Sequence, residues 1–247
     1  MWRTEGNTAR LSIEPLSAKL NQLRLAQGVF ELRFGDRLME GARILQVRAS
    51  VAALDRDERL LDSYVRGNDL IACYAPWPQR EVGPQLCWRC IDQADLAAVG
   101  LELIISVQTD LLDTDPGLTI GSEVPQGTVW RLVAADKPQF ERITFPDEPL
   151  ASYPTRQPAV LLYRPADVGC SFVEMIHPSD FAGAVLAAPP QGAGGYFSSF
   201  RLFDERLEKG VIRRGRLQGL FVARDGDQET AWNCYRRFAA SEIPLTT

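Results

Sequence analysis

The sequence predicts an all-β protein built from two packed antiparallel sheets, either an ordinary β-sandwich or a supersandwich, with one C-terminal helix. Three observations predict this class. Apolar and polar residues alternate with a period of two in many short segments, turn residues separate these segments, and no helical pattern lies between them. Because a parallel sheet needs crossover connections that are usually helical, a doubly wound α/β fold is disfavoured.

Alternation of apolar and polar side chains identifies the strands. It is clearest over 29–34, 44–51 and 102–109, where every second side chain is apolar and suits a strand with one face on the core. In the third of these segments, Glu102, Ser106 and Gln108 are expected to face outward. Further strands are expected at 20–25, 59–65, 70–74, 85–91, 129–133, 159–163, 170–176, 197–203 and 211–223.

A helix is predicted near 227–240, because large side chains recur there at intervals of three and four residues. Asp227 is expected to cap its first turn, and Pro244 would prevent its continuation. The helix should cover an apolar patch or an open edge of the sheets. The proline-rich stretch 137–158 is expected to be a long connection, or a join between subdomains, within a single domain spanning 1–247.

Composition narrows the class of partner. The 247 residues are 45% hydrophobic and carry a net charge of −5. This charge disfavours a nucleic-acid ligand, because proteins that bind nucleic acids usually carry an excess of basic residues. No apolar run approaches the ~20 residues that cross a bilayer, so no membrane partner is expected. An N-terminus unlike a signal peptide and an odd number of cysteines favour a cytoplasmic location. The oligomeric state is left open.

Several kinds of chemistry are excluded by the residue inventory. His177 is the only histidine, so one chain holds no two-histidine metal site. Cys87 and Cys90 are three apart in an expected strand, which points their thiols to opposite faces, and no second cysteine pair exists. Phosphate-loop and dinucleotide-binding fingerprints are missing. We therefore expect neither a metal nor a cofactor.

His177 with Glu174 is the candidate catalytic pair, because imidazole is the natural proton carrier near neutral pH. Regular alternation places the two on opposite faces of the strand 170–176, so they meet only if the strand breaks before Pro178. The alternative is a loop histidine bonded to the backbone.

Candidate ligand-binding residues lie in one turn and on two outward strand faces. Amides, carboxylates and arginines in a concavity suit a sugar, although a plain hairpin turn fits the turn residues equally well. The basic stretch 206–216 is either an anion site or a solvent-facing strand. The candidate residues are Arg66, Asn68, Asp69, Arg89, Glu102 and Gln108.

The long alternating strands and the chain length resemble the large β-sandwich of the galactose-mutarotase-like superfamily. The stretches 207–214 and 234–238 also resemble the ends of uncharacterised bacterial proteins. The superfamily's mechanism uses paired histidines with a glutamate. Since this chain has one histidine, the resemblance implies a sugar-binding fold without ring-opening epimerase activity.

Three functions follow as hypotheses. The first is a carbohydrate-binding protein whose ligand lies on a concave sheet face. The second is a protein-interaction or assembly module, and the third is an enzyme acting on sugars through His177 and a carboxylate. A wide, polar groove with an aromatic edge would favour the first, whereas a flat apolar patch with a polar rim would favour the second.

Overall fold

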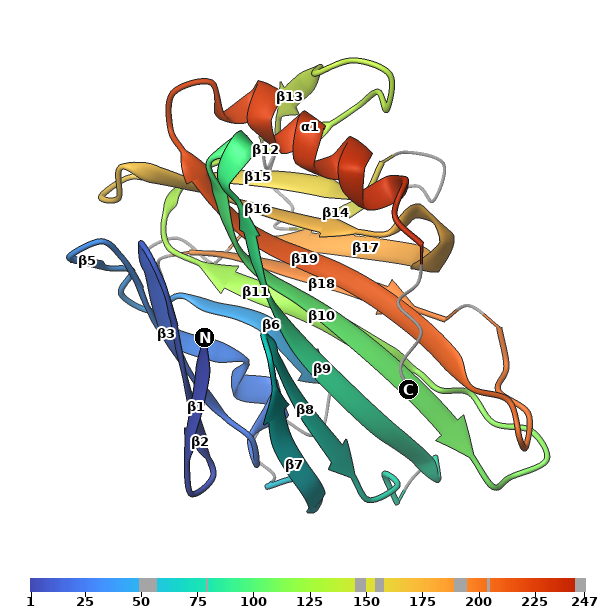
Figure 1. Ribbon diagram of the computed structural model, residues 1–247. Coiled ribbons are helices and arrows are strands. Elements are labelled where there is room, and N and C mark those ends of the chain that lie inside the picture. The colour runs from blue at the N-terminus through green and yellow to red at the C-terminus, as the bar shows by residue number, and fades with distance from the viewer. Residues whose placement is uncertain are drawn as a thin grey trace.

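The computed structural model describes residues 1–48, 57–78, 80–144, 150–153, 158–188, 195–203 and 205–242. These residues form two antiparallel sheets and one α-helix, which confirms the predicted all-β sandwich (Figure 1). Three short 3-10 turns, Leu25–Gln27, Ala94–Leu96 and Pro178–Asp180, connect strands.

The first sheet has ten strands. Their order in space is β1 (Trp2–Glu5), β2 (Thr8–Ile13), β3 (Leu16–Asn21), β4 (Val29–Phe34), β6 (Arg43–Arg48), β11 (Leu118–Val124), β18 (Tyr196–Leu202), β17 (Phe181–Ala187) and β14 (Leu150–Tyr153), with β5 (Arg37–Leu38) paired to β4.

The second sheet has nine strands and contains the longest ones. Their order is β13 (Phe140–Arg142), β12 (Gly127–Leu132), β15 (Val160–Pro165), β16 (Cys170–Ile176), β19 (Arg213–Ala223), β10 (Ala98–Thr109), β9 (Val82–Gln93), β8 (Asp69–Tyr74) and β7 (Leu60–Arg66).

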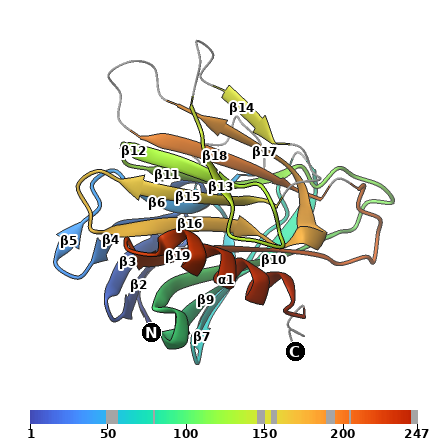
Figure 2. The same cartoon turned by 90° about the horizontal axis from the view of Figure 1, so that it is seen from above.

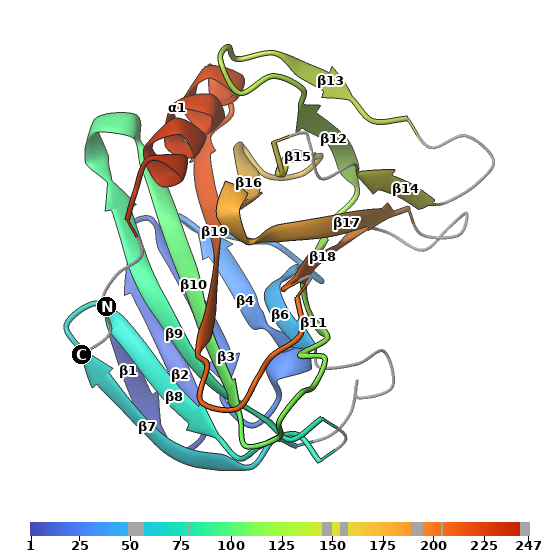
Figure 3. The ribbon, with the colours of Figure 1, turned by 90° about the vertical axis from the view of Figure 1, so that its right-hand side faces the viewer.

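The main core lies between the two sheets, whose layers are seen edge-on in Figure 3. Inward side chains of both sheets fill it, as the period of two requires. The Phe172 ring is 5.1 Å from the Phe221 ring and 5.7 Å from the Tyr163 ring. These aromatic contacts bind β15, β16 and β19 into the centre of the nine-stranded sheet.

A second, smaller core lies under the helix α1 (Asp227–Ala239), which covers the outer face of the nine-stranded sheet (Figure 2). The apolar stripe of α1, with Ala231, Cys234, Tyr235 and Phe238, packs on outward residues of β15, β16 and β19. Those strands are therefore buried on both faces, which explains why all seven residues of β16 are buried.

Some local expectations were wrong. Asp227 does not cap α1, because Gly226 precedes the helix in a left-handed conformation and Asp227 begins it. The expected strand 20–25 ends at Asn21, and β1 and β2 went unpredicted.

Alternation also fails at Leu45, whose φ of +55° interrupts the strand and leaves four consecutive buried residues in β6. Within 137–158, β13 and β14 form edge strands of different sheets. Residues 49–51 of the expected strand 44–51 lie outside the described residues.

Candidate functional site

The outer face of the nine-stranded sheet is covered by α1 over β15, β16 and the upper part of β19, and carries a groove over β7–β10. We call this groove over β7–β10 the outer groove. Its volume is about 670 Å³, and its lining comes from β7, β8, β9, β10, β19 and the loop before β19. The side chains that line it include Leu61, Cys73, Gln85, Ser106, Gln108, Lys209, Ile212 and Arg214.

Polar side chains from neighbouring strands form the floor of the outer groove. Gln85 on β9 and Arg214 on β19 are both directly opposite Ser106 on β10. Gln108 stands opposite Gly83, where an added Cβ would lie 3.7 Å from the Pro76 side chain. The floor therefore presents an amide, a hydroxyl, a second amide and a guanidinium within two adjacent rows of the sheet.

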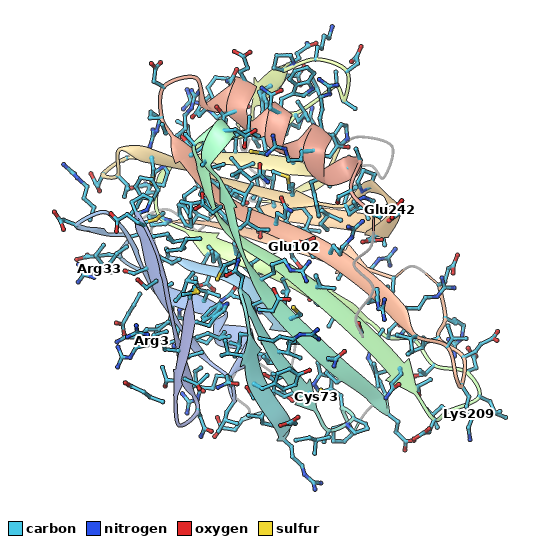
Figure 4. The ribbon with its side chains drawn as sticks, viewed as in Figure 1. Arg3, Arg33, Cys73, Glu102, Lys209 and Glu242 are labelled. Atoms are coloured by element: carbon cyan, nitrogen blue, oxygen red, sulfur yellow. The ribbon has the colours of Figure 1, made fainter. Side chains whose placement is uncertain are left out.

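The walls come from separate parts of the chain. Leu61 and Cys73 stand on the side of β7 and β8, and Lys209 and Ile212 come from the loop before β19. Figure 4 shows Cys73 and Lys209 on these two elements. The Gln85 amide donates to the Cys73 sulfur at 3.4 Å. Among the described cysteines, Cys73 alone is not fully buried.

A row of charged residues crosses the sheet next to the outer groove. Asp69, Arg89 and Glu102 are cross-strand partners on β8, β9 and β10. Arg89 donates two hydrogen bonds to the Asp69 carboxylate, both 2.9 Å long. Glu102 is nearly buried, and this burial raises its pKa, although Arg89 and Arg216 partly counteract the rise. Asp69 and Arg89 thus neutralise each other within the row.

Arg216 fixes the segment after α1 against this face. Its guanidinium is 1% exposed and donates to the backbone oxygens of Ser241 and Glu242, at 3.3 and 2.9 Å. Its backbone N–H donates to the Asp180 carboxylate at 2.9 Å. Residues 241–242 therefore cover this arginine and bound the charged row.

His177 lies beneath the end of α1. Its ring is 5.3 Å from the Phe238 ring, edge to face, and its Nδ1 accepts the backbone N–H of Ser179 at 3.3 Å. Burial and then nearby Arg216 lower its pKa, with Asp180 opposing them. The residue thus caps the short turn that follows β16, as in the backbone-bonded alternative above.

Glu174 faces the opposite side of the sheet, inside the sandwich. It accepts hydrogen bonds from the Ser122 and Ser198 hydroxyls at 2.5 and 2.6 Å, and lies 3.5 Å from the Tyr163 hydroxyl. Its side chain is fully buried, and this burial raises its pKa to about 7. The strand does not break before Pro178, so the structure does not bring Glu174 and His177 together.

The six candidate ligand residues separate into three groups. Gln108 lines the outer groove, and Asp69, Arg89 and Glu102 form the charged row. Arg66 ends β7, and Asn68 lies in the following turn, where its carbonyl accepts the Cys90 N–H at 2.9 Å.

Sequence reasoning missed Cys73 and Lys209 as groove residues. Outward alternation marks Gln85 and Ser106, and the basic stretch 206–216 contains Arg214, but nothing in the sequence shows that these residues meet.

Across the described ranges, no group of three or more histidine, cysteine, aspartate or glutamate residues could hold a metal ion. Within the same ranges, no helix is long and apolar enough to cross a membrane.

Comparison with known proteins shows a shared fold. No family model and no curated protein matches the sequence. A TPR-domain-containing protein from Parabacteroides distasonis has a similar structure over 97% of this chain, with a TM-score of 0.63 and 9% identity. The chain spans about half the length of that protein, 49%. At this identity the likeness concerns the fold alone.

A putative aldose 1-epimerase from Klebsiella pneumoniae is a weaker structural match. Its TM-score is 0.34 with 9% identity, over 99% of this chain and 90% of that one.

Proposed function

We propose that this protein binds a carbohydrate in the outer groove. The observation that carries the proposal is the floor, where Gln85, Ser106 and Gln108 present neutral groups that both donate and accept hydrogen bonds. Sugar hydroxyls also donate and accept, so amides and hydroxyls pair with them without burying a net charge. Arg214 on the floor, with Lys209 and Asp110 at the groove, adds charge that would favour a sugar with polar substituents.

The shape of the groove supports a small ligand. A volume of about 670 Å³ falls within the range of small-molecule sites. Leu61 and Ile212 offer apolar contact to the C–H face of a sugar ring. Tyr74, the aromatic residue that lines the groove, is buried and donates its hydroxyl to the Gln22 carbonyl. Without an exposed ring for stacking, we expect an affinity of about 1 mM, near −4 kcal/mol.

Calorimetric titration with a panel of neutral and acidic mono- and disaccharides tests the proposal. We expect saturable binding of at least one sugar. Ser106→Ala and Gln108→Ala should each weaken it about 5- to 10-fold, the equivalent of one net hydrogen bond. Gln126→Ala is a matched control, because Gln126 is exposed and outside the groove. If no sugar binds, or if both groove variants bind like the unaltered protein, the proposal fails.

A second function, self-assembly, is favoured by one specific observation. Leu61, Leu112 and Ile212 are 58%, 85% and 56% exposed, and two of them line the outer groove. Exposed apolar side chains that lie together, as Leu61 and Ile212 do, suit a protein contact. Under this proposal a second copy of the chain covers them, so Leu112→Ser with Ile212→Ser would abolish concentration-dependent association in light scattering. A protein that stays monomeric at all concentrations contradicts it.

A further inference from the structure

A group of basic side chains lies on the outer face of the ten-stranded sheet, at its N-terminal edge. The register places Arg3 of β1 directly opposite Arg10 of β2, and Arg10 directly opposite Lys19 of β3. Three cations therefore stand in one row across three neighbouring strands. Directly opposed residues of antiparallel strands have Cβ atoms about 5 Å apart, and like charges at that spacing destabilise the pair.

The adjacent row adds a fourth cation and two hydroxyls. Ser12 stands opposite Ser17, and Ser17 stands opposite Arg33 of β4. Both rows line one hollow of about 670 Å³, which we call the basic hollow. Figure 4 shows Arg3 and Arg33 on the N-terminal strands, apart from Cys73 and Lys209 of the outer groove.

Carboxylates neutralise only part of this charge. Glu31 lies 2.5 Å from the Lys19 ammonium, and Glu5 lies 3.2 Å from the Arg10 guanidinium. Both Arg10 and Glu5 are more than half exposed, so their mutual attraction is weak. Arg3 and Arg33 have no ion pair within the part of the chain that the structure describes. Among the described residues, two guanidinium groups thus lack a carboxylate partner, in a protein whose net charge is −5.

We propose that the basic hollow binds a ligand carrying two or more phosphate or sulfate groups. Guanidinium groups bind such oxyanions through paired hydrogen bonds, and the Ser12 and Ser17 hydroxyls supply further donors. A bound anion would also offset the repulsion within the row Arg3, Arg10 and Lys19. The basic hollow and the outer groove share no lining residue, so this site stands independently of the proposed sugar site.

Titration of the full chain at low ionic strength tests the proposal, with sodium tripolyphosphate and a sulfated disaccharide as probes and chloride as reference. Saturable one-to-one binding of either probe supports it, and the probe that binds tells a phosphate source from a sulfated sugar. The double variant Arg3→Gln, Arg33→Gln should bind at least 10-fold more weakly. Arg131→Gln, a partly exposed arginine of the other sheet, should bind like the unaltered protein.

Thermal unfolding gives a second readout. Without a bound anion, Arg3→Gln should raise Tm by about 1–3 °C, because it removes a like-charge contact. The rise in Tm that tripolyphosphate causes should shrink in the same variant. The proposal is overturned if neither probe binds more tightly than chloride, if the double variant binds as well as the unaltered protein, or if Arg3→Gln lowers Tm.

Discussion

Glu174 is a carboxyl group in an apolar interior, and the backbone around it explains its presence. β11 carries a bulge at Ser122. The Ser122 N–H donates a hydrogen bond to the Ser198 hydroxyl at 2.9 Å instead of to a backbone carbonyl of a neighbouring strand. The Leu45 N–H is accepted by the Ser122 hydroxyl at 3.2 Å. Both hydroxyls then donate to Glu174. The carboxyl therefore completes a hydrogen-bond network that satisfies buried donors outside the regular ladder.

The raised pKa of Glu174 predicts that stability falls as pH rises. Below about pH 4.5 the side chain is protonated in both states. Between 4.5 and about 7 the unfolded chain releases the proton while the folded protein keeps it, so unfolding becomes more favourable. The loss is complete above about pH 7 and is on the order of 3 kcal/mol. Glu174→Gln, which is neutral and similar in shape, should remove this dependence in urea unfolding at pH 5, 6, 7 and 8.

Two further variants complete that measurement. Glu141→Gln is a control, since Glu141 is exposed and paired with Arg131 at 3.2 Å, and it should keep the pH dependence of the unaltered protein. Glu174→Ala should be destabilised at every pH, because the serine hydroxyls then lose their acceptor and a cavity remains. A Glu174→Gln protein that loses as much stability between pH 5 and 7 as the unaltered protein would refute the assignment.

Thiol reactivity separates one cysteine from the others. Burial raises the pKa of Cys87 and Cys234 to about 12, and of Cys90 and Cys170 to about 11. Cys73 is half-buried at the outer groove. The native protein should therefore consume one equivalent of a small alkylating reagent quickly at pH 8, and the remainder only after unfolding. Cys73→Ser should abolish the fast phase, and a fast phase that survives this change would contradict the groove geometry.

The helix α1 is anchored at its first residue. Asp227 is 1% exposed and accepts two hydrogen bonds from Arg164, at 2.6 and 2.8 Å, and one from the Ser171 hydroxyl at 2.5 Å. These contacts fix the start of α1 to β15 and β16. A carboxylate in the first turn also interacts favourably with the helix dipole.

Replacing Asp227 should loosen the helix from the sheet. We expect Asp227→Asn to lower the free energy of unfolding by about 2 kcal/mol, because charged hydrogen bonds with Arg164 are lost. Asp95→Asn breaks the exposed pair with Arg237 and should change nothing measurable. Equal effects of the two substitutions in urea unfolding would argue against the anchoring role.

Elements with strict alternation were predictable, and those with backbone irregularities were not. In β9 the sequence placed Trp88 and Cys90 inward, and the structure confirms this arrangement. β6 departed from its pattern at Leu45, because a positive φ there changes which side chains face the core. No propensity of a leucine signals that conformation. The alternation in β16 correctly separated Glu174 from His177.

The outer groove could be predicted only in part. Outward alternation along β10 marks Ser106 and Gln108, but Lys209 comes from a loop about 100 residues later. Pairing of β10 with β19 brings these segments together, and such long-range pairing leaves no local mark in a sequence. Arg89 and Glu102 looked like ligand residues because outward charges on strands resemble a binding face, and Asp69 because it was expected in a polar turn. In the structure Asp69 and Arg89 form an ion pair beside Glu102, and this pairing neutralises much of that charge.

At the scale of the whole molecule, α1 determines where a ligand has access. By covering β15, β16 and the upper part of β19, the helix and residues 241–242 leave β7–β10 to form the outer groove. The ten-stranded sheet contributes the opposite layer and carries the basic hollow at its edge. The two surfaces thus differ in chemistry, since the outer groove mixes amide, hydroxyl and charged groups of both signs and the basic hollow is dominated by cations.

Protection of Cys73 is the most direct test of sugar binding in the outer groove. We would measure the alkylation rate of Cys73 against the concentration of the best sugar from the panel. The rate should fall in proportion to occupancy, and Gln108→Ala should require about 5- to 10-fold more sugar for the same protection. A sugar that binds by calorimetry yet leaves the Cys73 rate unchanged at saturation would contradict the account.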